Sequence, residues 1–538
     1  MKRLAAFFCL ALLSSPARAD TYPRQPGVDV LHYVFRIALL TDDGNEIHGE
    51  ATVTVRFLAD GVSALVLDLT SAKDGKGMTV ASVSSGGVPA GFRHEADRLR
   101  IDLGGPSMAG QQASFTIRYD GIPGNGLRLI PNIHGERTAF SENWPDRARH
   151  WLPTIDHPYD KATGEFIVTT RSEYQVVANG ALVEEADLGN GLRRTHYKQA
   201  APIASWLYAI GVSHFAVRHL GLVRGVPLES WVFPQDTEKG APALEADARA
   251  SLEFFSDRVG PYSYEKLAQV EAAGMSGGTE HASAIFYGEK GVTAGKAPVV
   301  HEIAHQWFGD SVTERDWDDV WLSEGFATYF TLLFTEHARG RDAFVDGLKK
   351  SRGSVLELEQ KLPDTPVIHR NLSDMRRVLS QLVYQKGGWT LHMLRGLIGG
   401  DAFWNGCRDY YRRFQNLNAS TDEFRQVMER ASGKDLSGFF SQWLRRSGVP
   451  RIEGTWRWDG ASKRVEVTLA QTQAEEPFRL RIEVGVVPAA GGLPRVERCE
   501  LDGRRAVFSF AADAEPASLI LDPETWLLAE IGSLTRVP

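Results

Sequence analysis

The chain has 538 residues, of which 43 % are hydrophobic and 24 % are charged, values ordinary for a globular protein and not for a disordered one. The formal net charge is −8, and without a basic patch nothing argues for a nucleic-acid-binding protein. The length is sufficient for two to four domains.

Residues 1–19 have the pattern of a signal peptide. Lys2 and Arg3 precede a short apolar run at 4–13, and Ala17-Arg18-Ala19 matches an A-x-A cleavage site. The run is too short to span a membrane, so we predict cleavage near Ala19 and export to the periplasm or the medium. No later segment is long and apolar enough to predict a stable membrane span.

Residues 20–212 are predicted to form an N-terminal β domain. Apolar and polar residues alternate at 51–57, which is typical of a half-buried strand. Turn signals such as Gly86-Gly87 and Gly124-Asn125-Gly126 recur between such runs.

The pattern becomes mostly helical from about residue 213, and residues 213–447 are predicted to form the next domain. Helices are expected at 242–258, at about 298–308, from 321 to about 340, and at about 374–395, 399–416 and 419–446. Alternation returns after Gly448-Val449-Pro450, which predicts a small β domain at 448–538. The fold class is therefore predicted to be multidomain α+β.

The segment His301-Glu302-Ile303-Ala304-His305 carries the strongest chemical signal in the chain. Residues i and i+4 share a helix face, so His301 and His305 can present two imidazole nitrogens to one Zn²⁺. Glu302 lies one step round the helix, where its carboxylate can reach a water on the metal. Eighteen residues separate His305 from Glu324, the predicted third protein ligand.

A structural role for these residues is the alternative. Two hydrogen-bonded core histidines beside a solvated glutamate would fit a bare motif, and Glu324 alone could complement a helix dipole. The apolar residues around the motif predict a buried helix, in which unpartnered histidines and a glutamate would be costly. The combination favours a metal site.

With these residues in place, the chain resembles the aminopeptidase N family of zinc metallopeptidases, the gluzincin aminopeptidases. It shares the histidine motif with the Glu324 spacing, including Trp321-Leu322-Ser323-Glu324-Gly325-Phe326-Ala327. Gly277-Gly278-Thr279-Glu280-His281 is similar to the family's G-x-M-E-N motif, and Tyr384-Gln385-Lys386-Gly387 to its tyrosine-lysine-glycine motif. The three motifs occur in the family's order.

The resemblance implies a thermolysin-like, mostly helical catalytic domain at 213–447 and a small β-sandwich domain at 448–538. It also implies one Zn²⁺ per chain on His301, His305 and Glu324. The family often continues into a large helical domain, which we do not expect here because the sequence stops at Pro538.

The implied activity is that of a metallo-aminopeptidase, a hydrolase that removes N-terminal residues from peptides with a free N-terminus. Zinc would activate a water, Glu302 would act as general base, and Tyr384 would donate to the oxyanion. Glu280, beside Gly277 and Gly278, would bind the substrate's α-ammonium group. Taken by itself, a helical tyrosine beside Leu382 and Val383 is more often a core residue.

Two features remain open in the sequence. The family often has a second amine- or carbonyl-binding Gln or Glu where this chain has Trp144, and Glu142 lies two residues earlier, so the first specificity pocket is undetermined. Cys407 and Cys499 fall in different predicted domains, so a disulfide between them is not expected.

Three alternatives compete with the aminopeptidase. A thermolysin-like endopeptidase shares the metal site but has no use for Glu280. A lipid-epoxide hydrolase, known from one branch of the family, uses the same metal. A binding or scaffold protein on an inactive peptidase fold is disfavoured because all five chemical residues are present. The sequence indicates neither the preferred N-terminal residue nor the oligomeric state.

Overall fold

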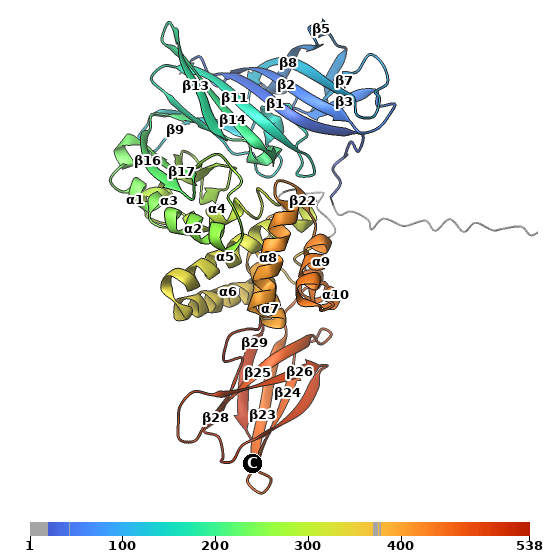
Figure 1. Cartoon of the computed structure of the whole chain (residues 1–538), viewed down its shortest axis with the longest axis vertical. Helices are drawn as coiled ribbons and strands as arrows, with labels where there is room; N and C mark the ends of the chain where they lie inside the picture. The colour runs from blue at the N-terminus through green and yellow to red at the C-terminus, as the bar shows by residue number, and fades with distance from the viewer. Residues whose placement is uncertain (1–19, 42–43, 370–374, 376–377) are drawn as a thin grey trace, which may run out of the picture.

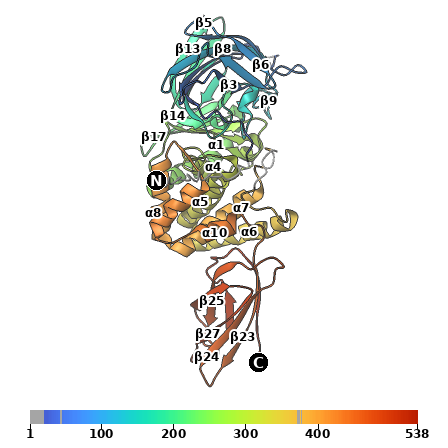
Figure 2. The same cartoon turned by 90° about the vertical axis from the view of Figure 1, so that its right-hand side faces the viewer.

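The computed structural model describes residues 20–41, 44–369, 375 and 378–538, so the predicted signal peptide lies outside the described residues. An N-terminal β region, a mostly helical middle region and a C-terminal β region follow one another along the long axis (Figures 1 and 2). The protein is thus multidomain α+β, with an N-terminal β domain followed by a helical domain, as predicted.

An eight-stranded sheet dominates the N-terminal region, with the strand order β13-β14-β11-β1-β2-β8-β4-β5. Strand β1 pairs in parallel with β11 and antiparallel with β2. The predicted alternation appears in β2, in which every second residue is buried. The bounds are β1 (Val28–Ala38), β2 (Ile47–Phe57), β4 (Gly77–Ser85), β5 (Val88–Pro89), β8 (Gln112–Ile122), β11 (Lys161–Arg171), β13 (Ala181–Gly189) and β14 (Leu192–Ala204).

Two smaller sheets complete this region. One has the order β3-β7-β6 and the other β12-β15-β10-β9. Strand β9 carries Arg128, and β10 leads directly to Glu142. These two strands bring both side chains to the helical region. The bounds are β3 (Ala64–Asp68), β6 (Phe92–Glu95), β7 (Arg98–Asp102), β9 (Leu127–Pro131), β10 (Arg137–Ser141), β12 (Gln175–Ala178) and β15 (Ile210–Ser213), with short 3-10 turns η1 (Ala148–His150) and η2 (Ser205–Leu207).

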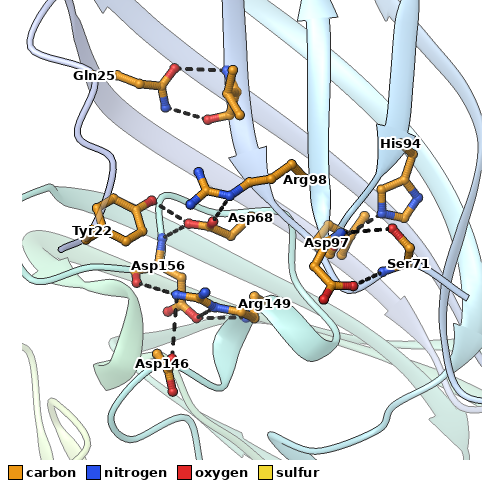
Figure 3. A network of polar contacts seen from close by, with 12 residues as sticks. Tyr22, Gln25, Asp68, Ser71, His94, Asp97, Arg98, Asp146, Arg149 and Asp156 are labelled. Atoms are coloured by element: carbon orange, nitrogen blue, oxygen red, sulfur yellow. Dashed lines mark hydrogen bonds and ion pairs between the residues drawn. The ribbon is translucent and has the colours of Figure 1, made fainter. Parts of the chain in front are cut away.

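The first described residues are held by a buried polar network (Figure 3). The Tyr22 hydroxyl donates to Asp68 Oδ2 at 2.5 Å, and Arg98 pairs with Asp68 Oδ1 at 3.0 Å. Arg149 pairs in turn with Asp156, whose backbone N–H also donates to Asp68. The hydrogen bond from Tyr22 to Asp68 thereby ties the segment before β1 to the network.

The middle region combines a five-stranded sheet, β16-β17-β18-β20-β19, with ten helices in the part that the structure describes. The strands are β16 (Ala216–Val223), β17 (Val226–Val232), β18 (Leu267–Ala272), β19 (Gly278–Thr279) and β20 (Ala284–Gly288); β21 (Thr313–Glu314) and β22 (Asn418–Ala419) pair separately. The helices are α1 (Gly240–Glu245), α2 (Ala248–Arg258), α3 (Glu289–Thr293), α4 (Val299–His305), α5 (Trp321–Arg339), α6 (Arg341–Lys361), α7 (Gln381–Ile398), α8 (Gly400–Phe414), α9 (Thr421–Ser432) and α10 (Ser437–Leu444), with the 3-10 turns η3 (Pro234–Asp236) and η4 (Trp317–Asp319).

Several helix predictions need correction. The helix expected at 242–258 is two helices, α1 and α2, and the one expected at 419–446 is also two, because Gly433 adopts a left-handed φ of 67° after α9. The motif helix α4 ends at His305, before the expected stop. Helix α6 was not predicted. Of the segment expected from about 374, the structure describes a helix only from Gln381.

Helices α5 and α7 pack with their backbones almost in contact. A Cβ atom on Gly325 of α5 would lie 2.9 Å from the carbonyl carbon of Gly387 on α7. A Cβ atom on Gly387 would in turn lie 3.1 Å from the Cα of Gly325, and one on Gly388 would lie 3.2 Å from the Thr328 methyl group. Only glycine permits this approach, which sets how closely the two helices lie.

Residues 451–536, here called the C-terminal β region, contain a four-stranded sheet, β27-β24-β23-β29, and a three-stranded sheet, β26-β25-β28. The bounds are β23 (Arg451–Asp459), β24 (Arg464–Gln471), β25 (Arg479–Val487), β26 (Arg495–Asp502), β27 (Arg505–Ala511), β28 (Ser518–Leu521) and β29 (Glu530–Arg536). Cys407 and Cys499 are both free and buried. Within the described residues, no helix has both the length and the apolar composition needed to cross a membrane.

Candidate metal centre and active site

Helices α4 and α5 bring the two histidines and Glu324 together. His301 Nε2 and His305 Nε2 lie 3.1 Å apart. Each of these nitrogens lies 3.3 Å from Glu324 Oε2. The i, i+4 spacing of the histidines and the position of Glu324 in the first turn of α5 produce this convergence.

The spacing of the three donor atoms fits a small divalent cation. Tetrahedral ligands about 2.0–2.1 Å from a Zn²⁺ ion lie about 3.3 Å from one another. The observed separations of 3.1–3.3 Å match this value. Two imidazole nitrogens and one carboxylate oxygen are also the donor set of hydrolytic zinc sites.

The ring of His305 is oriented by groups that the sequence did not identify. Its Nδ1 lies 3.0 Å from Ser323 Oγ and 3.3 Å from the Phe308 carbonyl oxygen, which leaves Nε2 for the metal. Gly309 packs directly against Ser323, so closely that a Cβ there would lie 2.3 Å from Ser323 Oγ.

Burial and charge oppose each other at the donors. Burial disfavours the Glu324 carboxylate, but His305 and His301 outweigh it and lower the pKa of Glu324 to about 2. Burial also lowers the pKa of His301. Burial opposes a charge on His305 as well, but the Glu280 and Glu324 carboxylates outweigh it and raise the pKa of His305 well above its usual range. Binding of a metal would therefore release the proton of His305, since a ligating imidazole must be neutral.

Glu302 projects from α4 toward β19, where Gly278 faces it. A Cβ atom on Gly278 would lie 2.6 Å from Glu302 Cγ and 2.6 Å from its Oε1. Burial and the neighbouring Glu280 raise the pKa of Glu302 well above its usual range. A carboxylate so placed holds a proton more readily than a solvated one, which suits a general base.

Glu280 follows β19 and faces the same donors. Its side chain is buried, and its Oε1 has no hydrogen-bond partner among the described residues. Its backbone carbonyl is fixed by Gln306 Nε2 at 2.8 Å. Burial raises the pKa of Glu280 to about 7. Gly277, with φ of 74°, forms the turn into β19, while Gly278 lines the cavity with Glu280.

Tyr384 lies at the start of α7 on the opposite side of His301. The two rings are stacked, with centroids 6.1 Å apart and an interplanar angle of 16°. Burial and the adjacent Glu324 carboxylate raise the pKa of Tyr384, so its hydroxyl keeps its proton. It is therefore available as a hydrogen-bond donor at the mouth of the metal centre.

These groups line one cavity of about 640 Å³. Glu142 and Trp144 form part of its wall, together with Arg128 and Arg147. Glu142 is already engaged: its Oε2 accepts from Arg128 Nη2 at 3.0 Å and also from Arg147 Nη1. Glu142 is therefore tied to two arginines rather than free to bind a substrate amine.

Fold and site together define a metallohydrolase, with a histidine-pair helix and a glutamate-bearing helix around one zinc site. The chain belongs to peptidase family M1: residues 30–207 match the Peptidase M1 N-terminal domain and residues 244–443 match the Peptidase family M1 domain. The cofactor of this family is zinc, which the donor set fits.

Named relatives are aminopeptidases. Glutamyl aminopeptidase of Bitis rhinoceros is 28 % identical over 362 residues, which cover 63 % of this chain but only 38 % of that protein. Aminopeptidase N of Streptomyces lividans is 26 % identical over 554 residues, covering 92 % of this chain and 62 % of that one. The chain thus spans well under half the length of the glutamyl aminopeptidases.

Solved structures show the same architecture. The M1 zinc metallopeptidase of Deinococcus radiodurans superposes with a TM-score of 0.69 at 25 % identity, over 79 % of this chain and 95 % of that one. Aminopeptidase A of Legionella pneumophila, solved with aspartic acid, gives a TM-score of 0.82 at 19 % identity, over 96 % of this chain and 61 % of that one. Because the identity is only 19 %, the match to aminopeptidase A shows similarity of the fold alone.

Proposed function

We propose that the protein is an exported zinc aminopeptidase that removes N-terminal residues from peptides. One observation carries the proposal: the buried Glu280 carboxylate faces the metal donors across the cavity, and its Oε1 lacks a hydrogen-bond partner among the described residues. A free α-ammonium group is the substrate feature that would pair with it. An internal peptide bond offers no such charge and would leave Glu280 unpaired.

The other residues then divide the chemistry. When bound, zinc supplies a Lewis acid that polarises the scissile carbonyl and lowers the pKa of a water. Glu302 accepts a proton from the attacking water and passes it to the leaving amine. The Tyr384 hydroxyl donates to the developing oxyanion. His301, His305 and Glu324 hold the metal, and Ser323 keeps the His305 ring in place.

The names of the relatives support peptide hydrolysis from the N-terminus, since they include aminopeptidase N and glutamyl aminopeptidase. The A-x-A pattern ending at Ala19 supports export. A thermolysin-like endopeptidase remains the second candidate, because it would use the same metal centre. Nothing at the site specifically favours a lipid epoxide as the substrate.

The deciding experiment compares free and N-acetylated aminoacyl anilides and short peptides, each with and without a chelator. Cleavage of the free-amine substrates alone, abolished by the chelator and restored by zinc, is the expected result. Equal cleavage of acetylated peptides would remove Glu280 as an amine anchor and identify an endopeptidase. Export is tested by sequencing the N-terminus of the protein recovered outside the cytoplasm, which should begin at Asp20.

A further inference from the structure

Helix α7 carries Tyr384 in its first turn, and it contacts both the C-terminal β region and the segment that leads into that region. The C-terminal sheets lie below the helical region in both views, and below the label of α7 in Figure 1 (Figures 1 and 2). The contacts occur at two places: beside Tyr384, at Lys386, and near the far end of the helix, between His392 and Gly396.

The contact beside Tyr384 is a buried ion pair that holds the segment just before the C-terminal β region. The Lys386 side chain is fully buried, and its Nζ donates to Glu359 Oε1 at 2.7 Å, to the Gly448 carbonyl at 2.9 Å and to the Arg446 carbonyl at 3.3 Å. Glu359 Oε2 accepts the Gly448 N–H at 2.9 Å. Lys386 and Glu359 therefore hold both backbone polar groups of Gly448, where the chain leaves the helical region.

The far contact involves the loop 522–529, between β28 and β29. His392 Nε2 donates to the Thr525 carbonyl at 2.8 Å, because its Nδ1 faces the Tyr329 hydroxyl at 3.1 Å. The His392 ring stacks on Trp526, with centroids 4.7 Å apart and an interplanar angle of 10°. Trp526 also covers Gly396, where an added Cβ would lie 2.8 Å from the indole.

This loop is itself rigidly held. The Asp522 carboxylate accepts the backbone N–H groups of Trp526 at 2.7 Å and of Leu527 at 3.1 Å. Arg352 of α6 pairs with Asp522 at 3.4 Å and donates to the Leu527 carbonyl at 3.4 Å. The indole of Trp526 is thus fixed relative to both α6 and α7.

The opposite face of α7 packs on α5 in two ways. Near Tyr384 the contact is made by Gly387 and Gly388 against Gly325, and glycines form no side-chain ridges that interlock with grooves. Farther along, His392 meets the Tyr329 hydroxyl and Arg395 pairs with Glu336 at 3.1 Å. The glycine contact fixes the distance between the helices near Tyr384, whereas the axial position of α7 depends on side-chain contacts, to which Lys386 and Trp526 add from the other side of the helix.

We propose that the C-terminal β region is a brace that sets the axial position of α7 and thereby places the Tyr384 hydroxyl over the metal centre. This inference rests on the proposed function of Tyr384. Lys386 and Trp526 are then positioning residues: they act on the reaction only through Tyr384. A displacement of about 1 Å in a group that stabilises a transition state can reduce the rate by about 100-fold.

The test is a double-mutant cycle in the full chain, with Trp526→Ala and Tyr384→Phe made singly and together. We expect Trp526→Ala to lower kcat about tenfold, with KM within about twofold and one zinc retained per chain. In the Tyr384→Phe background it should lower kcat no further, because the hydroxyl that it positions is already absent. Trp526→Phe, which keeps a ring on His392, should restore most of the activity.

Trp458→Ala is the matched control, since this tryptophan of β23 donates instead to the Ala512 carbonyl within the C-terminal β region. If Trp526→Ala does not fold, Gly396→Ala displaces the indole while raising helix propensity, and should lower kcat in the same Tyr384-dependent way. An unchanged kcat, or an equal loss in the Tyr384→Phe background, would overturn the brace. An unchanged kcat in Tyr384→Phe alone would overturn the role of Tyr384 and the brace with it.

Discussion

The side chain of Glu302 rests against the backbone of Gly278, so closely that any larger residue at 278 would displace the carboxylate. Gly278, two residues before Glu280, therefore leaves room for the side chain of Glu302 on α4. In this way the segment that carries the proposed amine anchor also shapes the space for the proposed general base.

Gly278→Ala is expected to lower kcat about tenfold or more, because the new Cβ at 2.6 Å forces Glu302 away from its position. Zinc content should be unchanged, since the substitution does not touch the ligands. Gly353→Ala in α6 is the control, because a Cβ there meets no atom within 4 Å. Equal activity in the two variants would mean that Glu302 tolerates displacement.

Glu302→Gln keeps the size of the side chain but removes the proton acceptor. We expect kcat to fall by at least about 100-fold, while the protein still binds one zinc per chain. Steady-state kinetics and metal analysis on the same preparation provide the measurement. Retained hydrolysis would contradict the assignment of Glu302 as general base.

Glu280→Gln should weaken recognition of the free amine. The loss of one charged pair, about 2 kcal/mol, corresponds to a decrease of about 30-fold in kcat/KM for free-amine peptides. The zinc content should stay at one ion per chain, and that measurement serves as the internal control. A parallel loss of zinc and activity would indicate that Glu280 supports the metal centre rather than the amine.

Glu142→Gln removes the negative charge between Arg128 and Arg147 in the cavity wall. The freed positive charge should favour an acidic first side chain, raising the ratio of kcat/KM for glutamyl over alanyl anilides about fivefold, or about 1 kcal/mol. Asp146→Asn, which alters an acidic residue outside the cavity lining, is the control. An unchanged ratio would show that the first side chain lies away from these arginines.

We expect the stability of the protein to depend on pH through the buried carboxyl of Asp160. Burial raises the pKa of its carboxyl to about 8, whereas in the unfolded chain the group titrates near 4. Between these two pKa values the folded state therefore holds a proton that the unfolded state has lost. The contribution of the Asp160 carboxyl to the free energy of unfolding is complete below about pH 4 and is lost as the pH rises toward 8. The loss amounts to up to about 1.4 kcal/mol per pH unit.

Asp160→Asn cannot ionise, so its free energy of unfolding should lack this component. We expect the free energy of unfolding of the wild type, measured by chemical denaturation, to fall relative to that of the variant as the pH rises from 5 to 8. Asp346→Asn on the exposed surface of α6 is the control variant. A difference that stays constant over this range would show that Asp160 is already charged in the folded state.

The sequence predicted the parts of the structure that follow from local spacing. The i, i+4 histidines and the alternating strand at 51–57 are read directly from residue periodicity. Helix α6 was missed although Phe344, Leu348, Ser351 and Val355 share its buried face, because Gly347, Gly353 and many charges obscure the pattern.

Partners brought together from distant segments could not be predicted. Arg128 and Glu142 lie on either side of β10, and only the folding of β9 against it pairs their side chains. The hydrogen bond between Ser323 and His305 likewise depends on the packing of α5 on α4. Ser323 directly precedes Glu324, and that adjacency was the one available signal.

The buried state of Cys407 and Cys499 has a practical consequence. Burial raises the pKa of both thiols, that of Cys499 to about 11, so neither offers a reactive thiolate near neutral pH. A cysteine introduced at an exposed site of the described residues should therefore react selectively with a maleimide dye. Fluorophores placed on α7 and on the C-terminal sheets could then report the distance between these elements in solution.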